Sequence, residues 1–165
     1  MVANMKVRHS EPADIPAIRA IYAEPTVQAS TLQLPYPSLE LWENRLLTPN
    51  LNFHSLVAVA DERVFGHLGI HIFESPRRRH AANIGLGVSE SARRRGVASA
   101  LVDAAIDLCE KWAGIRRIEL ETYTDNEPAI ALFKRKGFLV EGAARGYALR
   151  DGCYVDALLM ARHAA

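Results

Sequence analysis

Arg93-Arg94-Arg95-Gly96-Val97-Ala98 joins an apolar run ending at Val88 to a long segment with helical periodicity. A strand that turns tightly into a helix leaves the first N–H groups of the helix without partners, and such groups attract anions. Gly96 leaves room for a phosphate beside the backbone, Ala98 keeps the next contact small, and the arginines add positive charge. The spacing Arg-x-x-Gly-x-Ala therefore predicts a cradle for a cofactor that carries a pyrophosphate.

The same residues allow two other interpretations. Three arginines before a helix are also typical of a solvated surface turn or of a nucleic-acid patch. Lys and Arg number 20 against 19 Asp and Glu, which gives a net charge of +1. A balance so close to neutral gives no reason to expect nucleic acid as a partner. The choice between a surface turn and a phosphate cradle depends on the rest of the chain.

Length and composition predict a single domain over residues 1–165. With 49% hydrophobic and 24% charged residues, the chain can bury a sizeable core. Neither the widely separated Cys109 and Cys153 nor the six histidines have the spacing of metal ligands, so we expect no metal. The first ten residues lack a signal-peptide core, and no run of about 18 apolar residues occurs. We therefore expect a cytoplasmic protein without membrane association.

Hydrophobic periodicity and turn residues predict alternating strands and helices. The predicted strands cover residues 5–9, 54–60, 64–73, 80–88, 118–124, 138–147 and 154–161. The predicted helices cover residues 12–22, 39–47 and 97–112, and a fourth opens at 127 and stops at 136–137. Prolines punctuate the segment between the first two helices, which we expect to be irregular and to cover a site. This order predicts an α+β or mixed α/β domain.

Two motifs at a set separation carry a resemblance over nearly the whole chain. Leu86-Gly87-Val88 and Arg93-x-x-Gly96-x-Ala98 are followed by Asn126-x-x-Ala129-x-x-Leu132-Phe133-x-x-x-Gly137-Phe138. The chain resembles the GCN5-related N-acetyltransferase (GNAT) superfamily. The segments TLQLPYPS, GVASALVDAAIDLCEKW, DNEPAI and YALRDGCYVDALLMAR look like those of its bacterial L-amino acid N-acetyltransferases. The resemblance implies a mixed, mostly antiparallel sheet of six to seven strands flanked by about four helices, with two parallel strands splayed at the cofactor cleft.

The resemblance also implies acetyl-CoA as the acetyl donor, inserted between the two splayed strands. The backbone of the strand ending at Val88 would pair with the pantetheine amides. The turn at 93–99 would hold the pyrophosphate, Asn126 would bond the pantetheine arm, and Phe133 would lie beside the thioester. The implied cofactor-binding residues are Leu86, Val88, Arg93, Arg94, Gly96, Val97, Ala98, Ser99, Asn126 and Phe133.

Glu121 is the candidate general base. It precedes Asn126 by five residues on the strand expected to line the gap. By resemblance this matches the position of a base in ribosomal-protein alanine acetyltransferases. A carboxylate there could deprotonate an ammonium directly or through water. The alternative is that Glu119 and Glu121 form the solvent-facing half of an alternating strand.

Phe133 departs from the family pattern, since many members have a tyrosine that protonates the leaving thiolate there. Phenylalanine cannot donate a proton. Either CoA leaves unassisted, because a thiol pKa is only about 8.5, or Tyr123, Tyr147 or Tyr154 supplies the proton. We expect Tyr147, whose strand runs toward the same end of the sheet. Each of the three tyrosines can instead be purely structural.

Acceptor recognition is expected at the segment 31–37 and at a loop between Tyr147 and Tyr154. Gln33 would offer hydrogen bonds and Tyr36 an aromatic wall. A carboxylate on the acceptor would also need a cation, for which Arg145 and Arg150 are the nearest candidates.

The resulting prediction is acetyl transfer from acetyl-CoA to the primary amine of a small molecule, foremost an L-amino acid, by direct attack on the thioester. Peptide N-termini, polyamines and amino-acid-like antibiotics are alternative acceptors. A noncatalytic acyl-CoA-binding or sensing module is a further alternative, because Phe133 replaces the usual acid. A monomer and a homodimer are both compatible with the sequence.

Overall fold

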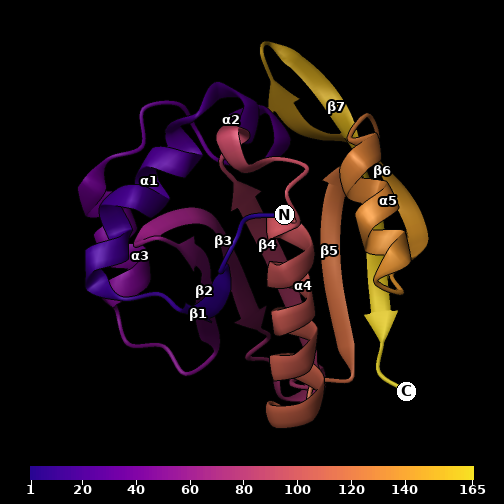
Figure 1. Ribbon diagram of the computed structural model, residues 1–165. Coiled ribbons are helices and arrows are strands. Elements are labelled where there is room, and N and C mark those ends of the chain that lie inside the picture. The colour runs from indigo at the N-terminus through magenta and orange to yellow at the C-terminus, as the bar shows by residue number, and fades with distance from the viewer.

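A single seven-stranded sheet forms the centre of the computed structural model, which describes residues 1–165 (Figure 1). Its strand order is β1-β2-β3-β4-β5-β7-β6. Only β4 and β5 run parallel, and every other neighbouring pair is antiparallel. The strands are β1 (Lys6–His9), β2 (Phe53–Ala60), β3 (Arg63–Ile72), β4 (Ala81–Val88), β5 (Arg117–Tyr123), β6 (Leu139–Arg150) and β7 (Cys153–His163). The predicted mixed, mostly antiparallel sheet is confirmed.

Five α-helices cover the two faces of this sheet. They are α1 (Ile15–Ala23), α2 (Pro25–Ser30), α3 (Leu39–Leu47), α4 (Val97–Asp107) and α5 (Glu127–Arg135). One hydrophobic cluster joins α1, α2 and α3 to Val57, and a second joins α4 and α5 to Leu56 and Ala58. Because adjacent strand residues point to opposite faces, the first three helices lie on one face and the last two on the other. None of the helices combines the length and apolar character needed to cross a membrane.

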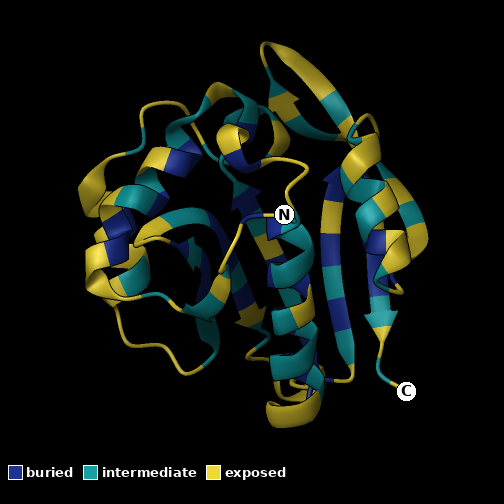
Figure 2. Ribbon diagram, viewed as in Figure 1, coloured by how far each residue is buried: buried dark blue, intermediate teal, exposed yellow.

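The alternation of buried and exposed residues along β5 decides which face each side chain serves (Figure 2). Ile118 and Leu120 belong to the cluster beneath α4 and α5. Glu119 and Glu121 therefore point to the opposite face, on the side of α1, α2 and α3. This geometry directs Glu121 away from the main core.

The parallel pairing of β4 and β5 is short. It joins only Ala81–Asn83 to Arg117–Glu119. Beyond this segment β4 stays paired with β3 as far as Val88, and β5 stays paired with β7 as far as Tyr123. The two strands thus diverge while each keeps its outer partner, and the predicted splay is confirmed.

The structure corrects four predicted boundaries. A short 3-10 turn (Pro12–Asp14) precedes α1. Residues 25–30 were predicted to be irregular but form α2, because proline is tolerated in a first helical turn. The helix predicted to reach 112 changes to π geometry over Leu108–Trp112. The predicted loop after Tyr147 is wrong: β6 continues to Arg150 and only a two-residue turn precedes β7. Asp151 and Gly152 both have positive φ, 49° and 77°, as a tight hairpin turn requires.

Candidate active site

A cleft of about 1240 Å³ opens where β4 and β5 diverge. Residues 84–88 of β4 and 120–123 of β5 both line it, together with the first turn of α4. Of the predicted site residues, Tyr36, Arg145 and Tyr154 lie outside the cleft. Those that line it include Gln33, Leu86, Val88, Arg93, Arg94, Gly96, Val97, Ala98, Ser99, Glu121, Asn126, Phe133 and Tyr147.

The turn before α4 has the geometry of an anion site. Arg94 and Gly96 adopt positive φ angles of 58° and 83°, and the helix has no side-chain cap. The backbone N–H groups of residues 96–99 make no hydrogen bond in the protein. Consecutive free N–H groups at a helix start attract phosphate. A Cβ at Gly96 would meet only Met1, at 3.8 Å, so the backbone conformation and not crowding requires glycine here.

Contacts from distant segments hold this turn in place. The Glu24 carboxylate accepts hydrogen bonds from Ser89 Oγ at 2.8 Å and from the Glu90 N–H at 2.7 Å. The Val2 N–H donates to the Arg95 carbonyl at 3.2 Å. The turn is therefore connected both to the α1–α2 junction and to the N-terminus.

Asn126 and Phe133 place α5 beside the same cleft. Asn126 is the N-cap of α5, since its Oδ1 accepts from the Ala129 N–H at 3.4 Å. Its amide NH2 donates to no protein group. Phe133 is buried and packs edge-to-face against Phe138, with ring centroids 5.7 Å apart. The position next to the cleft thus has an apolar ring without a proton donor.

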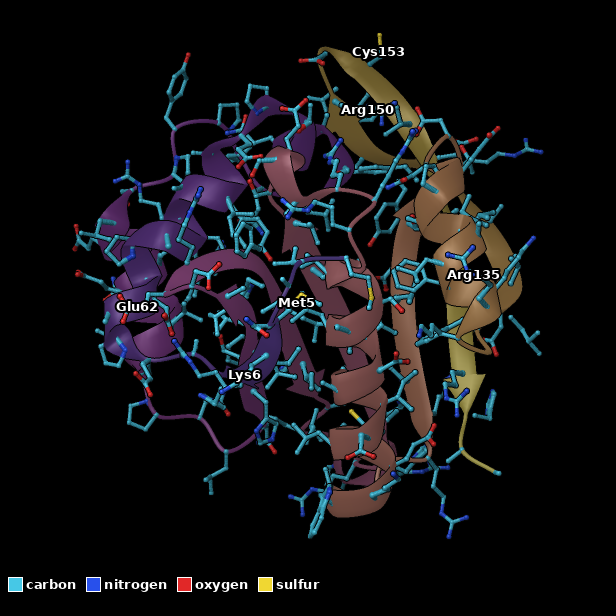
Figure 3. The ribbon with its side chains drawn as sticks, viewed as in Figure 1. Met5, Lys6, Glu62, Arg135, Arg150 and Cys153 are labelled. Atoms are coloured by element: carbon cyan, nitrogen blue, oxygen red, sulfur yellow. The ribbon has the colours of Figure 1, made fainter.

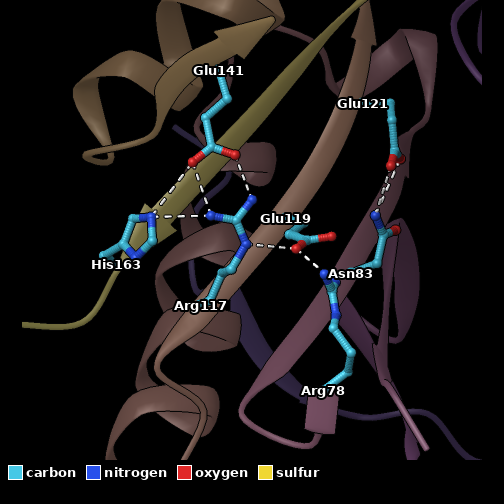
Figure 4. A network of polar contacts seen from close by, with 7 residues as sticks. All are labelled: Arg78, Asn83, Arg117, Glu119, Glu121, Glu141 and His163. Carbon is cyan, nitrogen blue, oxygen red and sulfur yellow. Dashed lines mark hydrogen bonds and ion pairs between the residues drawn. The ribbon is translucent and has the colours of Figure 1, made fainter. Parts of the chain in front are cut away.

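Glu121 lies in the cleft with an oriented carboxylate. Asn83 on β4 donates through Nδ2 to both carboxylate oxygens, each at 3.1 Å (Figure 4). Glu119, two residues earlier, pairs instead with Arg78 and Arg117 at the closed end of the splay. The two glutamates of the alternating strand therefore have different surroundings, and only Glu121 faces the cleft.

The three candidate tyrosines also differ in their surroundings. The Tyr123 hydroxyl donates to the Thr31 carbonyl at 2.9 Å, and the Tyr154 side chain is 75% exposed outside the cleft. Tyr147 lines the cleft, and its hydroxyl does not bond to the Thr31 carbonyl. Burial, followed by the negative charge of Glu121, raises the pKa of Tyr147 above its usual value. The phenol of Tyr147 is therefore protonated at neutral pH.

An aromatic wall closes the cleft on the side of α1 and α3. Tyr22 stacks on Trp42 with ring centroids 4.6 Å apart, and its hydroxyl is 2.8 Å from His67 Nδ1. His67 Nε2 is 2.9 Å from Ser55 Oγ, which in turn accepts from Ser10 Oγ at 2.7 Å. Burial lowers the pKa of His67 to about 3, so the ring is neutral.

The predicted acceptor residues are only partly brought together. Gln33 lines the cleft, and its Oε1 accepts from Arg45 Nη1 at 2.7 Å. Tyr36 is 96% exposed and does not form the expected wall, a role that falls to Tyr22 and Trp42. Arg150 lines the cleft, whereas Arg145 does not.

The sequence analysis missed Trp42, Arg45, His67 and Asn83. Each lies on a helix or strand whose pattern reads as ordinary surface or core, so nothing in the local sequence separates it from structural residues. No group of three or more His, Cys, Asp or Glu side chains is arranged as metal ligands.

A splayed sheet with free N–H groups at its mouth and a carboxylate inside defines a transferase that uses a CoA thioester. Residues 15–138 match the model of the acetyltransferase (GNAT) family. The chain belongs to this family and is an acetyl-CoA-dependent N-acetyltransferase.

Individual relatives agree with the family match. The chain is 45% identical to the L-amino acid N-acetyltransferase AaaT of Escherichia coli (strain K12) over 161 residues, which cover 98% of this chain and 99% of that protein. A solved GCN5-related N-acetyltransferase from Kribbella flavida superposes with a TM-score of 0.86 at 28% identity, covering 97% and 98% of the two chains. A phosphinothricin acetyltransferase from Sinorhizobium meliloti, solved with acetyl-CoA, superposes with a TM-score of 0.86 at 23% identity. The match covers 96% of this chain and 88% of that chain, which shows the shared fold.

Proposed function

We propose that this enzyme acetylates the α-amino group of L-amino acids. The observation that carries the proposal is the 45% identity, over 98% of the chain, to the L-amino acid N-acetyltransferase of Escherichia coli. A cleft with an oriented carboxylate on its acceptor side supports it, because an amino acid presents an ammonium that must lose a proton before it attacks.

On the donor side, the residues present fit a CoA thioester. The free N–H groups of residues 96–99 would bind the pyrophosphate, and Arg93 and Arg94 would add positive charge. Leu86 and Val88 lie on the splayed segment, where strand-like pairing with an extended pantetheine arm can occur. Asn126 has a free amide NH2 for the same arm. When bound, acetyl-CoA supplies the activated acetyl group.

On the acceptor side, Glu121 would take the proton from the acceptor ammonium, directly or through water. Asn83 would hold the carboxylate in orientation through its two hydrogen bonds. The free amine then attacks the thioester carbonyl carbon. The N–C bond forms, the C–S bond breaks and CoA leaves as the thiolate, while the second proton of the attacking nitrogen passes to water. Glu121 keeps the proton until solvent removes it.

Tyr147 would donate a hydrogen bond or a proton to the departing sulfur. Its raised pKa makes the phenol a weaker acid than a thiol of pKa about 8.5, so full proton transfer to a thiolate is uphill. We therefore infer that Tyr147 assists departure only modestly. The replacement of the usual tyrosine by Phe133 agrees with this, because a thiolate is an acceptable leaving group.

The test is to incubate purified protein with acetyl-CoA and a panel of acceptors while following free thiol. The panel contains L-amino acids, their D-enantiomers, a peptide, spermidine and an amino-acid-like antibiotic. We expect thiol release with L-amino acids in excess of every other class. Release only with polyamines or peptides would overturn the acceptor assignment, and acetyl-CoA binding without release would favour a sensing module.

A further inference from the structure

We propose that Arg45 binds the carboxylate of the acceptor and thereby selects amino acids over simple amines. This inference rests on the proposed function, since it names the group that recognises the acceptor. A carboxylate in a partly enclosed site needs a positively charged partner, and the cleft offers several cations.

Five arginines and no lysine line the cleft, and they come from different elements. Arg93 and Arg94 belong to the turn before α4, and Arg135 lies on α5 on the donor side. Arg150, on the β6–β7 hairpin that ends near Cys153 (Figure 3), forms an ion pair with Asp125 and also donates to the Ala29 carbonyl at 3.4 Å. Arg45 is the remaining one, and it has no carboxylate partner.

The guanidinium of Arg45 is held at a fixed place by the aromatic wall. Its Cζ lies 5.0 Å from the ring centroid of Trp42, which is 3% exposed and stacks on Tyr22. The hydrogen bond between Tyr22 and His67 fixes this stack from behind. A cation placed over a buried, immobile ring loses little freedom when it binds an anion.

The same guanidinium has unused donors. Of its five N–H bonds, one on Nη1 is donated to Gln33 Oε1 at 2.7 Å. The donors on Nε and Nη2 form no hydrogen bond in the protein, and this pair matches the two oxygens of a carboxylate.

Apart from the phosphate turn, Arg135 and the ion pair of Arg150 with Asp125, the charged groups that line the cleft are Arg45 and Glu121. A zwitterionic amino acid matches both, with its ammonium toward Glu121 and its carboxylate toward Arg45. A polyamine would bring a second positive charge toward Arg45 and be repelled. The arrangement therefore favours acceptors that carry a carboxylate as well as the reacting amine.

The experiment compares an L-amino acid with its carboxamide, which keeps the amine and side chain but lacks the negative charge. For Arg45→Gln we expect KM for the amino acid to rise about 10- to 100-fold, as for a lost charged hydrogen-bonded pair. The carboxamide should show almost no change in KM, and kcat should change little for either. Arg45→Lys should recover part of the loss, because it restores the charge without the paired donors.

Arg63→Gln is the matched control, since Arg63 also lies over an aromatic ring, 5.4 Å from the centroid of Phe65, but outside the cleft. It should leave both acceptors unaffected. An unchanged acetyl-CoA affinity in Arg45→Gln shows that the variant is folded. Equal effects on acid and amide, or none, would overturn the role of Arg45. Failure of the proposed function is a separate result, visible as no thiol release by the wild type with any L-amino acid.

Discussion

Glu121 is the group whose replacement tests the acetyl-transfer chemistry most directly. Glu121→Gln keeps the shape of the side chain but cannot accept a proton, so we expect the rate at pH 7 to fall by about 10² to 10⁴-fold. The rate should recover partly at alkaline pH, where the free amine is abundant. A pH–rate profile of kcat/KM measures both effects.

Glu119→Gln is the control for that measurement, since Glu119 lies on the same strand but pairs with Arg78 and Arg117 at the closed end of the splay (Figure 4). It should leave the profile unchanged. If Glu121→Gln has the wild-type profile, then another group or water alone removes the proton.

Tyr147 is expected to contribute far less than Glu121. Because its pKa is raised by burial and by Glu121, it can support the leaving sulfur mainly through a hydrogen bond. We expect Tyr147→Phe to lower kcat by about 10-fold or less, an effect of at most about 1.4 kcal/mol on the barrier. Single-turnover kinetics measure this step, and a loss of more than about 100-fold would make Tyr147 an obligatory acid.

The sequence predicted side chains of the donor side better than those of the acceptor side. Gly96 and Asn126 belong to turns whose geometry requires particular residue types, so short motifs reveal them. Trp42 and His67 come together only through the packing of α3 on β3, and neither has a local signal. The exposure of Tyr36 could not be foreseen, because an aromatic residue between prolines fits a wall and an exposed loop equally well.

The turn before α4 is a local element whose free backbone N–H groups are the proposed pyrophosphate site. In Gly96→Val, a β-branched residue would have to adopt φ near 83°, which it strongly resists. We expect the N–H groups of residues 96–99 to lose their alignment and the Kd for acetyl-CoA to rise at least about 10-fold. Isothermal titration calorimetry with acetyl-CoA measures this change.

Gly114→Val separates the binding effect from the general cost of strain. Gly114 also has positive φ, 68°, with open space around a Cβ, and it lies outside the cleft. Both variants should lose about 1 kcal/mol or more of stability. Only Gly96→Val should weaken acetyl-CoA binding, and equal affinities in the two variants would argue against the turn as the pyrophosphate site.

The elements that the sequence predicted well have a strong hydrophobic periodicity or a turn signal. The helix at 39–47 has its predicted bounds, and the strand before the arginine turn is correct to one residue. The β6–β7 hairpin is longer than predicted, because its outer part is half-exposed and lacks a clear alternation. Helix α2 was missed because prolines on both sides concealed a six-residue helix that begins at one of them.

The arrangement of the whole sheet was implied by the resemblance to the GNAT superfamily, but the closed end of the splay was not. There Arg117 on β5 pairs with Glu119 and with Glu141 of β6, and His163 of β7 completes the cluster (Figure 4). These charges are far apart in the sequence. They connect β5, β6 and β7 beside the short parallel segment, and Arg78, which precedes β4 in the chain, also pairs with Glu119.

Global stability should depend on pH through His67. Its pKa is about 3 in the folded protein because it is buried, against about 6.5 when unfolded. Below pH 6.5 the unfolded chain therefore binds a proton that the folded protein does not. The free energy of unfolding should have its full value above pH 6.5. Between pH 6.5 and pH 3 it should fall by up to about 1.4 kcal/mol for each pH unit.

Urea unfolding at pH 7 and pH 5 measures this slope. We expect His67 to account for a loss of about 2 kcal/mol over that range. His67→Gln should be less stable at pH 7, because the bonds to Tyr22 and Ser55 change, but its stability should vary less with pH. His54→Gln is the comparison, since burial also lowers the pKa of the half-buried His54, and it should remove a smaller part of the slope. If His67→Gln keeps the full wild-type slope, then His67 is not the group that links folding to the proton.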